Sequence, residues 1–167
     1  MPWWGWLLII LVGGLVLLCA GGFGILAYIG AKGPDTKVYT GNEVPAKFVS
    51  IVRKLNLLDA GEQVRFFYSD AIVDVEESFT VATDKRIVIY LKAAETPATI
   101  VPYNQISEAS LDSSGTWIED GTMTLELHDG SIVSFPVSSE GGRDKQFHQA
   151  ILTAMDKAQP TTAPNVE

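Results

Sequence analysis

Hydrophobic residues follow three different patterns along this chain, and the first is an uninterrupted apolar run. Leu7–Ile29 contains no charged residue, and its 23 residues would span roughly 35 Å as a helix. A bilayer core is about 30 Å thick. Three tryptophans precede the run and a tyrosine lies near its end, as aromatic rings do at headgroup level. The pattern predicts a transmembrane helix over residues 4–31.

The second pattern has helical spacing. A polar segment containing Gly33–Pro34 predicts a linker over residues 32–43. Residues 44–57 then predict an amphipathic helix with Pro45 in its first turn. Its apolar residues recur three and four positions apart, and we expect them to pack on the following domain rather than on lipid: Phe48, Ile51, Val52 and Leu55.

The third pattern has a period of two and begins at Glu62. It predicts seven short strands, over residues 63–69, 77–83, 86–91, 98–103, 107–113, 122–128 and 131–137. A closing helix follows, with Asp144 as its expected N-cap and an apolar stripe at helical spacing: Phe147, Ala150, Ile151, Ala154 and Met155. The polar residues 158–167 predict a disordered tail.

Side-chain parity predicts the register of two hairpins. A turn centred on Asp84–Lys85 pairs Val81 with Val88 and Phe79 with Tyr90. A three-residue loop over His128–Gly130, with Gly130 left-handed, pairs Leu125 with Val133 and Met123 with Phe135. A two-residue turn would place Phe135 on the outer face, so we expect the longer loop.

Three stretches resemble bacterial pleckstrin-homology-like (PH-like) domains: Leu58–Asp70, Ser78–Tyr90 and Ile100–Ile106. In that family a Gly–Glu pair opens the first strand, a Thr–Asp–x–Arg turn joins the second and third, and a Pro–Tyr segment leads into the fifth. The resemblance covers residues 58–157. It implies a mainly β fold, a barrel of about seven antiparallel strands in two sheets capped by a C-terminal helix, and a non-catalytic role, without naming a ligand.

The charge changes sign along the chain. Five basic residues and two acidic residues give residues 32–54 a balance of +3, whereas sixteen acidic and seven basic residues give residues 62–157 a balance of −9. The positive-inside rule therefore predicts a cytoplasmic domain and an N-terminus outside. The same basic residues are predicted membrane-surface contacts, each contributing about 1 kcal/mol beside anionic lipid: Lys32, Lys37, Lys47, Arg53 and Lys54.

Small residues mark one stripe of the predicted transmembrane helix. Such stripes allow two helices to approach closely. The stripe is either a contact with a second copy or another membrane helix, or only the ordinary abundance of Gly and Ala in membrane helices: Gly13, Ala20, Gly24, Ala27 and Ala31. Cys19 lies within "LLCAGG", but Leu18 stands where a lipoprotein cleavage site has a small residue. We therefore interpret Cys19 as a lone thiol in the helix.

Lys85–Arg86 is the only adjacent basic pair in the predicted domain. It is either a weak anion contact or the corner of a hairpin, and we favour the corner. PH domains that bind phosphoinositides resemble one another in carrying Lys and Arg between their first two strands, but here Asp70–Glu77 contains four acids and no base. This departure argues against headgroup binding there, and the overall acidity argues against nucleic acid.

No catalytic, cofactor or metal motif is visible in the sequence. His128 and His148 have no nucleophile or orienting partner at motif spacing. Trp117 lies in a polar loop, where it is either a protein contact or a plug for one end of the barrel. We therefore expect no cofactor and no enzymatic activity. We predict a single-pass membrane adaptor that binds another protein. The alternatives are a lipid-binding or lipid-transfer domain with an apolar cavity, and an extracytoplasmic domain.

Overall fold

The computed structural model describes residues 12–14, 19, 22, 37–71, 74–113 and 120–159. The chain forms two units, Met1–Gly33 and Pro34–Glu167. Every described residue of the first unit is helical. No helix formed by described residues has the length and apolar character needed to cross a bilayer. The rest of the predicted transmembrane helix, 4–31, lies outside the described residues, as do linker residues 32–36 and tail residues 160–167.

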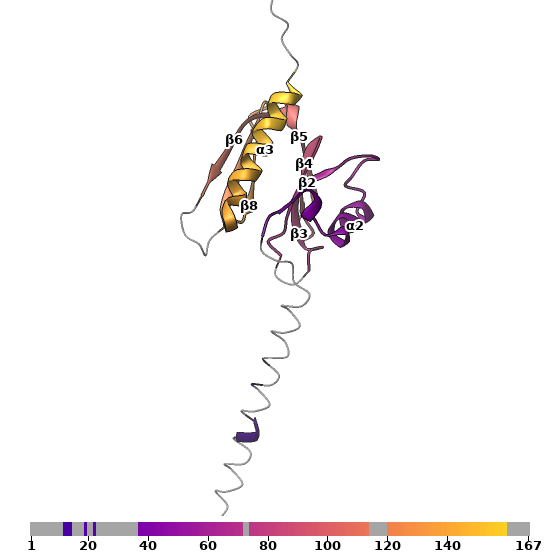
Figure 1. Ribbon diagram of the computed structural model, residues 1–167, viewed down its shortest axis with the longest axis vertical. Helices are drawn as coiled ribbons and strands as arrows, with labels where there is room; N and C mark the ends of the chain where they lie inside the picture. The colour runs from indigo at the N-terminus through magenta and orange to yellow at the C-terminus, as the bar shows by residue number, and fades with distance from the viewer. Residues whose placement is uncertain are drawn as a thin grey trace, which may run out of the picture. The chain divides into compact units, whose positions relative to one another are not determined.

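The second unit contains two antiparallel sheets and two main helices (Figure 1). The five-stranded sheet has the order β1 (Tyr39–Thr40), β2 (Val64–Tyr68), β3 (Ser78–Thr83), β4 (Arg86–Leu91) and β5 (Ala98–Pro102). The three-stranded sheet has the order β6 (Ile106–Asp112), β7 (Gly121–Leu127) and β8 (Ile132–Val137). The helices are α2 (Ala46–Lys54) and α3 (Arg143–Ala158), with short 3-10 segments η1 (Gly41–Glu43), η2 (Tyr103–Gln105) and η3 (Glu140–Gly142).

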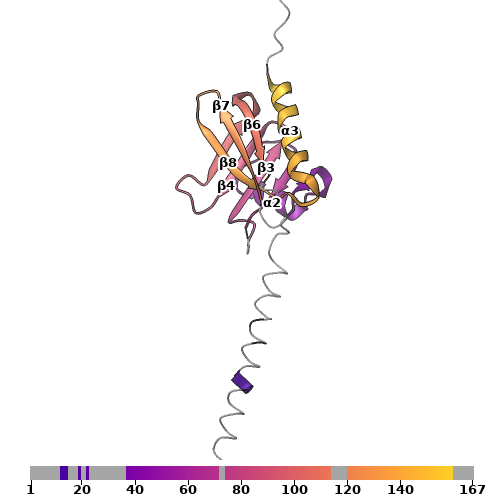
Figure 2. The same ribbon diagram turned by 90° about the vertical axis from the view of Figure 1, so that its left-hand side faces the viewer.

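The main core lies between the two sheets and α3. Alternate side chains of the strands meet the apolar face of α3 there, as expected for a barrel closed by a helix. Phe147 is fully buried, stacks on Phe66 of β2 at 5.0 Å between ring centroids, and also contacts Phe135 of β8. Figure 2 shows α3 along one side of the sheets. The C-terminal helix therefore joins both sheets through one aromatic cluster.

A second core lies on the opposite face of the five-stranded sheet, where α2 packs. Phe48 and Val52 of α2 are buried against this face. Phe48 stacks on Phe67 of β2 at 4.9 Å, and Phe67 in turn stacks on Phe79 of β3 at 5.7 Å. Val81, also fully buried, lies in the same cluster. The predicted stripe of α2 thus packs on the domain.

Both predicted hairpin registers are confirmed. Phe79 pairs with Tyr90 and Val81 with Val88 across β3 and β4. Leu125 pairs with Val133 and Met123 with Phe135 across β7 and β8. Gly130 has φ 84°, the left-handed conformation that the three-residue loop needs. The β7 and β8 pairs face the main core, whereas the β3 and β4 pairs face α2.

The structure differs from the sequence predictions at three places before α3. The predicted linker contributes β1, which pairs with Phe66 and Phe67 of β2, and Val38 is fully buried. Pro45 is the N-cap of α2 rather than part of its first turn. The compact unit begins at Pro34 rather than at residue 58, because β1 adds a strand to the five-stranded sheet and α2 packs on its face.

The predicted N-cap of α3 is wrong. Gly142, with φ 69°, occupies that position, and Asp144 lies inside the first turn with 1% of its surface exposed. Its Oδ2 atom accepts a hydrogen bond from Ser113 Oγ at 3.0 Å. The carboxylate therefore joins the helix start to the end of β6, and the negative charge near a helix N-terminus is favourable.

Candidate functional site

The corner between β3 and β4 holds a buried ion pair. The side chain of Glu62 is fully buried, and Arg86 donates to both of its oxygens, from Nε to Oε1 at 3.0 Å and from Nη2 to Oε2 at 2.8 Å. Asp59 Oδ1 also lies close to the guanidinium, 3.1 Å from the same Nη2 atom. A bidentate guanidinium–carboxylate pair has a fixed geometry, so it holds the start of β4 against the segment before β2.

Thr83 and Tyr103 complete this corner. Thr83 Oγ1 donates to Glu62 Oε1 at 2.6 Å and accepts from the backbone N–H groups of Lys85 and Arg86. Tyr103 is buried, and its hydroxyl donates to the carbonyl of Thr83 at 2.9 Å. The Gly–Glu, Thr–Asp–Lys–Arg and Pro–Tyr segments, far apart in sequence, therefore meet in one hydrogen-bonded network.

The pKa directions follow from this network. Burial alone would raise the pKa of Glu62, but hydrogen bonds from Thr83, the Asp59 amide and Arg86 outweigh it and lower the pKa below the ordinary value. Burial, helped by the charges of Asp84 and Glu62, raises the pKa of Tyr103 far above its ordinary range. The corner therefore holds an ionised carboxylate and a neutral phenol at neutral pH.

A groove lies directly beside this corner, between it and α3. Its volume is about 1110 Å³. Phe66, Ala82 and Tyr103 provide its partly or fully buried apolar floor, and Thr83 lines it as well. The strand side of its rim carries Arg65, Asp84 and Lys85, all exposed.

Helix α3 forms the other wall of the groove with two parallel rows of side chains. The outer row is polar and exposed, and its members are four positions apart: Lys145, Gln149, Thr153 and Lys157. The inner row is mostly alanine: Gln146, Ala150, Ala154 and Ala158. Residues four apart lie on one face of a helix. The alanines leave space along the helix, and the outer row borders that space with polar groups.

The groove is positively charged although the domain is acidic. Four cationic side chains and one carboxylate line it: Arg65, Lys85, Lys145, Lys157 and Asp84. Within the part of the chain that the structure describes, none of the four cations makes an ion pair. The carboxylate of Asp84 already has a local partner, because its Oδ1 accepts a hydrogen bond from the backbone N–H of Gln63 at 2.9 Å. The four cations are therefore available to an anionic ligand.

The structure separates the two members of the predicted anion contact. Arg86 points into the corner, where its guanidinium is 18% exposed and paired with Glu62 and Asp59. Lys85 is exposed and lines the groove. Arg86 is thus a structural residue, and Lys85 is the member that faces solvent beside a recess.

Three of the predicted membrane-surface residues lie on α2. Lys47, Arg53 and Lys54 are exposed, on the face that does not pack on the sheet. Lys47 Nζ lies 4.9 Å from the centroid of the Phe48 ring, and Lys54 Nζ lies 3.4 Å from Glu76. Lys37 precedes β1, with its Nζ 5.0 Å from the Tyr39 ring centroid. None of them lines the groove.

Several predicted contacts lie outside the described residues. Trp117 and Lys32 are among them. So are four of the five small residues of the predicted helix contact, Ala20, Gly24, Ala27 and Ala31, whereas Gly13 is described and helical.

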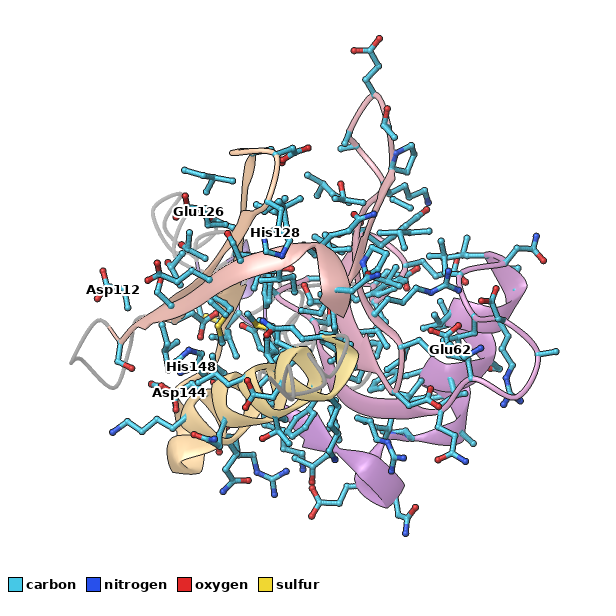
Figure 3. All side chains as sticks on the ribbon, turned by 90° about the horizontal axis from the view of Figure 1, so that it is seen from above. Glu62, Asp112, Glu126, His128, Asp144 and His148 are labelled. Atoms are coloured by element: carbon cyan, nitrogen blue, oxygen red, sulfur yellow. The ribbon has the colours of Figure 1, made fainter. Side chains whose placement is uncertain are left out.

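The titratable groups labelled in Figure 3, all of them described residues, lie in separate parts of the domain. In Figure 3, Glu62 lies on the α2 side of the domain, well apart from His128, Asp144 and His148. His148 Nε2 lies 2.8 Å from the carbonyl oxygen of Ala109, so that nitrogen carries the proton and donates. Within the described ranges, no three His, Cys, Asp or Glu residues come together to hold a metal ion.

Sequence reasoning missed Arg65, Lys145, Lys157 and the glutamines of the groove. The spacing of the polar row on α3 was visible in the sequence. The strand side of the groove was not visible in the sequence, because Arg65 lies at a register shift between β2 and β3 that no local pattern signals. Only the tertiary fold brings the two walls together.

No family model and no curated protein matches the chain. Solved structures do. A pleckstrin-homology domain from Shewanella amazonensis is 16% identical, with a TM-score of 0.50 over 69% of this chain and 93% of that one. A PH-domain-containing protein from Exiguobacterium sibiricum is 17% identical, with a TM-score of 0.51 over 72% of this chain and 62% of that one. A pleckstrin-homology protein from Shewanella loihica is 16% identical, with a TM-score of 0.47 over 74% and 97%.

At these identities the comparisons show the fold alone. The second unit contributes two antiparallel sheets followed by a C-terminal helix to this comparison. The residues that carried the resemblance in the sequence form the corner beside the groove. The second unit of this chain therefore has a PH-like fold.

Proposed function

We propose that this protein is a non-catalytic, membrane-anchored adaptor whose PH-like domain binds another protein in the groove along α3. One observation carries the proposal: a recess with an apolar floor is bordered by four cations that have no ion-pair partner among the described residues, on a domain that is otherwise acidic. An apolar floor with a polar rim is the usual arrangement of a protein-binding surface. Lys85, Lys145 and Lys157 provide the charge that selects the partner.

Membrane anchoring rests on the sequence. The uncharged run Leu7–Ile29 supports a single span, and the basic residues that follow it support a cytoplasmic domain. The basic face of α2 supports a position close to anionic lipid, whereas the acidic body of the domain is repelled by the same surface. In this arrangement the groove is presented to a cytoplasmic partner near the membrane.

Co-purification from native membranes tests the proposal. The full chain is solubilised in mild detergent and compared with the variant Lys85→Glu/Lys145→Glu, which reverses charge on both walls. The control is Lys92→Glu, because Lys92 is exposed on the β4–β5 turn outside the groove. We expect a protein that co-purifies with the wild type and the control and is lost from the double variant.

Two results contradict the proposal. If the double variant retains the same protein as the wild type, the groove is not the binding surface. If the double variant loses anionic lipid and no protein, the module binds lipid, which was the alternative expected from the sequence.

A further inference from the structure

The partner's chemistry can be inferred from the shape of the groove and the spacing of its charges, on the basis of the proposed function. We propose that the groove binds an extended peptide segment of the partner that carries acidic residues at both ends of a short stretch of small side chains. Each part of this description matches one feature of the groove.

The length of the bound peptide segment follows from the spacing of two lysines on α3. Lys145 and Lys157 are twelve residues apart, so their Cα atoms lie about 18 Å apart along the helix axis. An extended chain advances roughly 3.3 Å per residue, so five or six residues span that distance. A single phosphate group contacts only cations that surround one point. Charges at the two ends of a long wall instead fit carboxylates that are separated along a peptide.

The negative charge expected of the peptide follows from the partners that each basic residue near the groove already has. Arg143 is held by Glu43 and the Val38 carbonyl, and Arg86 by Glu62, so both are structural. Lys145 and Lys157 have no such partner among the described residues, and neither has Arg65 or Lys85 on the facing wall. An acidic segment would meet cations on both sides of the groove.

The small side chains expected in the middle of the peptide follow from the inner row of α3. Ala150 lies between the polar row and the strand side, and it is not among the residues that pack against the main core. The space beside it exists because its side chain is a single methyl group. Gln146 and Gln149 border the same space, and side-chain amides can both donate to and accept from a peptide backbone. A peptide backbone that bonds to these amides lies close to α3 and takes up this space, and a large ligand side chain directed at the helix would hold that backbone away.

Titration of the full chain in detergent micelles with synthetic peptides tests the inference. The probe is a fluorescein-labelled peptide of about ten residues, with two glutamate pairs separated by five or six alanines and threonines. One control peptide has the same composition with all the glutamates contiguous, and another has lysine in place of glutamate. Glycerol 3-phosphate and inorganic phosphate serve as headgroup and anion probes.

We expect the spaced peptide to bind in a salt-sensitive manner and the lysine peptide not to bind. Lys145→Ala/Lys157→Ala should weaken binding about five- to tenfold, whereas Lys92→Ala should change it less than about twofold. Ala150→Leu should weaken binding by a similar factor without changing any charge, because it fills the centre of the groove. The lysine variants alter exposed side chains, so they keep the test valid if Ala150→Leu fails to fold.

Three results overturn the inference: equal binding of the spaced and contiguous peptides, equal binding to the wild type and the lysine double variant, or a groove-dependent response to glycerol 3-phosphate or phosphate without peptide binding. The co-purification experiment is separate. A partner lost from the charge-reversed groove together with no peptide binding would reject this ligand and leave the adaptor function in place.

Discussion

Glu62 and Arg86 form a bidentate ion pair in which the carboxylate is completely buried and the guanidinium is 18% exposed. Asp59 forms a second ion pair with the guanidinium, and the hydroxyl of Thr83 donates to the carboxylate. This relationship explains why the Lys85–Arg86 pair divides into one structural residue and one residue of the groove.

Removing one partner of this pair should destabilise the domain strongly. Glu62→Gln leaves Arg86 partly buried without its main carboxylate, and such losses typically cost about 3–5 kcal/mol. The free energy of unfolding in urea measures the effect. Lys85→Gln, at the adjacent exposed position, is the control and should change it by less than about 0.5 kcal/mol. A Glu62→Gln variant as stable as the wild type would show that the corner does not hold the barrel.

The same carboxylate should make stability depend on pH. Because the folded protein lowers the pKa of Glu62 below its ordinary 4.5, the group contributes its full stabilisation only above that value. This contribution is lost as the pH falls through the lowered folded pKa. We therefore expect the free energy of unfolding to fall on acidification below about pH 4.5. The Glu62→Gln variant should show a smaller decrease over the same window; parallel curves would contradict the assignment.

The hydroxyl of Thr83 should matter more than its methyl group. Thr83→Val keeps the shape and removes the hydroxyl contacts with Glu62, Lys85 and Arg86, at a cost of about 1–3 kcal/mol. Thr83→Ser keeps the hydroxyl and should recover most of this loss in thermal unfolding. A serine variant that is no more stable than the valine variant would place the effect in packing instead.

Helix α2 should be required for the stability of the domain. Phe48→Ala removes the ring that stacks on Phe67 and should cost about 3–5 kcal/mol. Arg53→Ala, on the exposed face of the same helix, is the matched control and should cost less than about 0.5 kcal/mol. A chain that begins at Leu58 lacks α2 and exposes Phe67 and Val81, so we expect it to aggregate, whereas a chain that begins at Pro34 stays monodisperse in size-exclusion chromatography.

The strand order and two hairpin registers could be predicted because each depends on local alternation. Val81 and Val88 had to share a face for both to be buried, and Gly130 allowed the turn that keeps Phe135 inside. The pairing of Tyr39–Thr40 with β2 could not be predicted in the same way. A two-residue strand such as β1 carries no period, and its position depends on pairing with Phe66 and Phe67.

The candidate site was predictable only in part. Lys85 stood out because it lies next to Arg86, but the sequence did not show which of the two is paired, since Glu62 is more than twenty residues away. The charges of α3 look like an ordinary solvent-exposed helix face. They become one wall of a groove because Phe147 packs on Phe66 and brings β2 alongside the helix.

Site-specific photocrosslinking in native membranes tests the central claim, that the groove along α3 binds a protein, most directly. A photoreactive residue replaces Gln149 on the groove wall, and a control replaces Thr122, which is exposed on β7 outside the groove. We expect a discrete protein adduct from position 149, none from position 122, and loss of the adduct when Lys85→Glu/Lys145→Glu is added. Equal labelling at both positions, or labelling of lipid alone at position 149, would contradict the account.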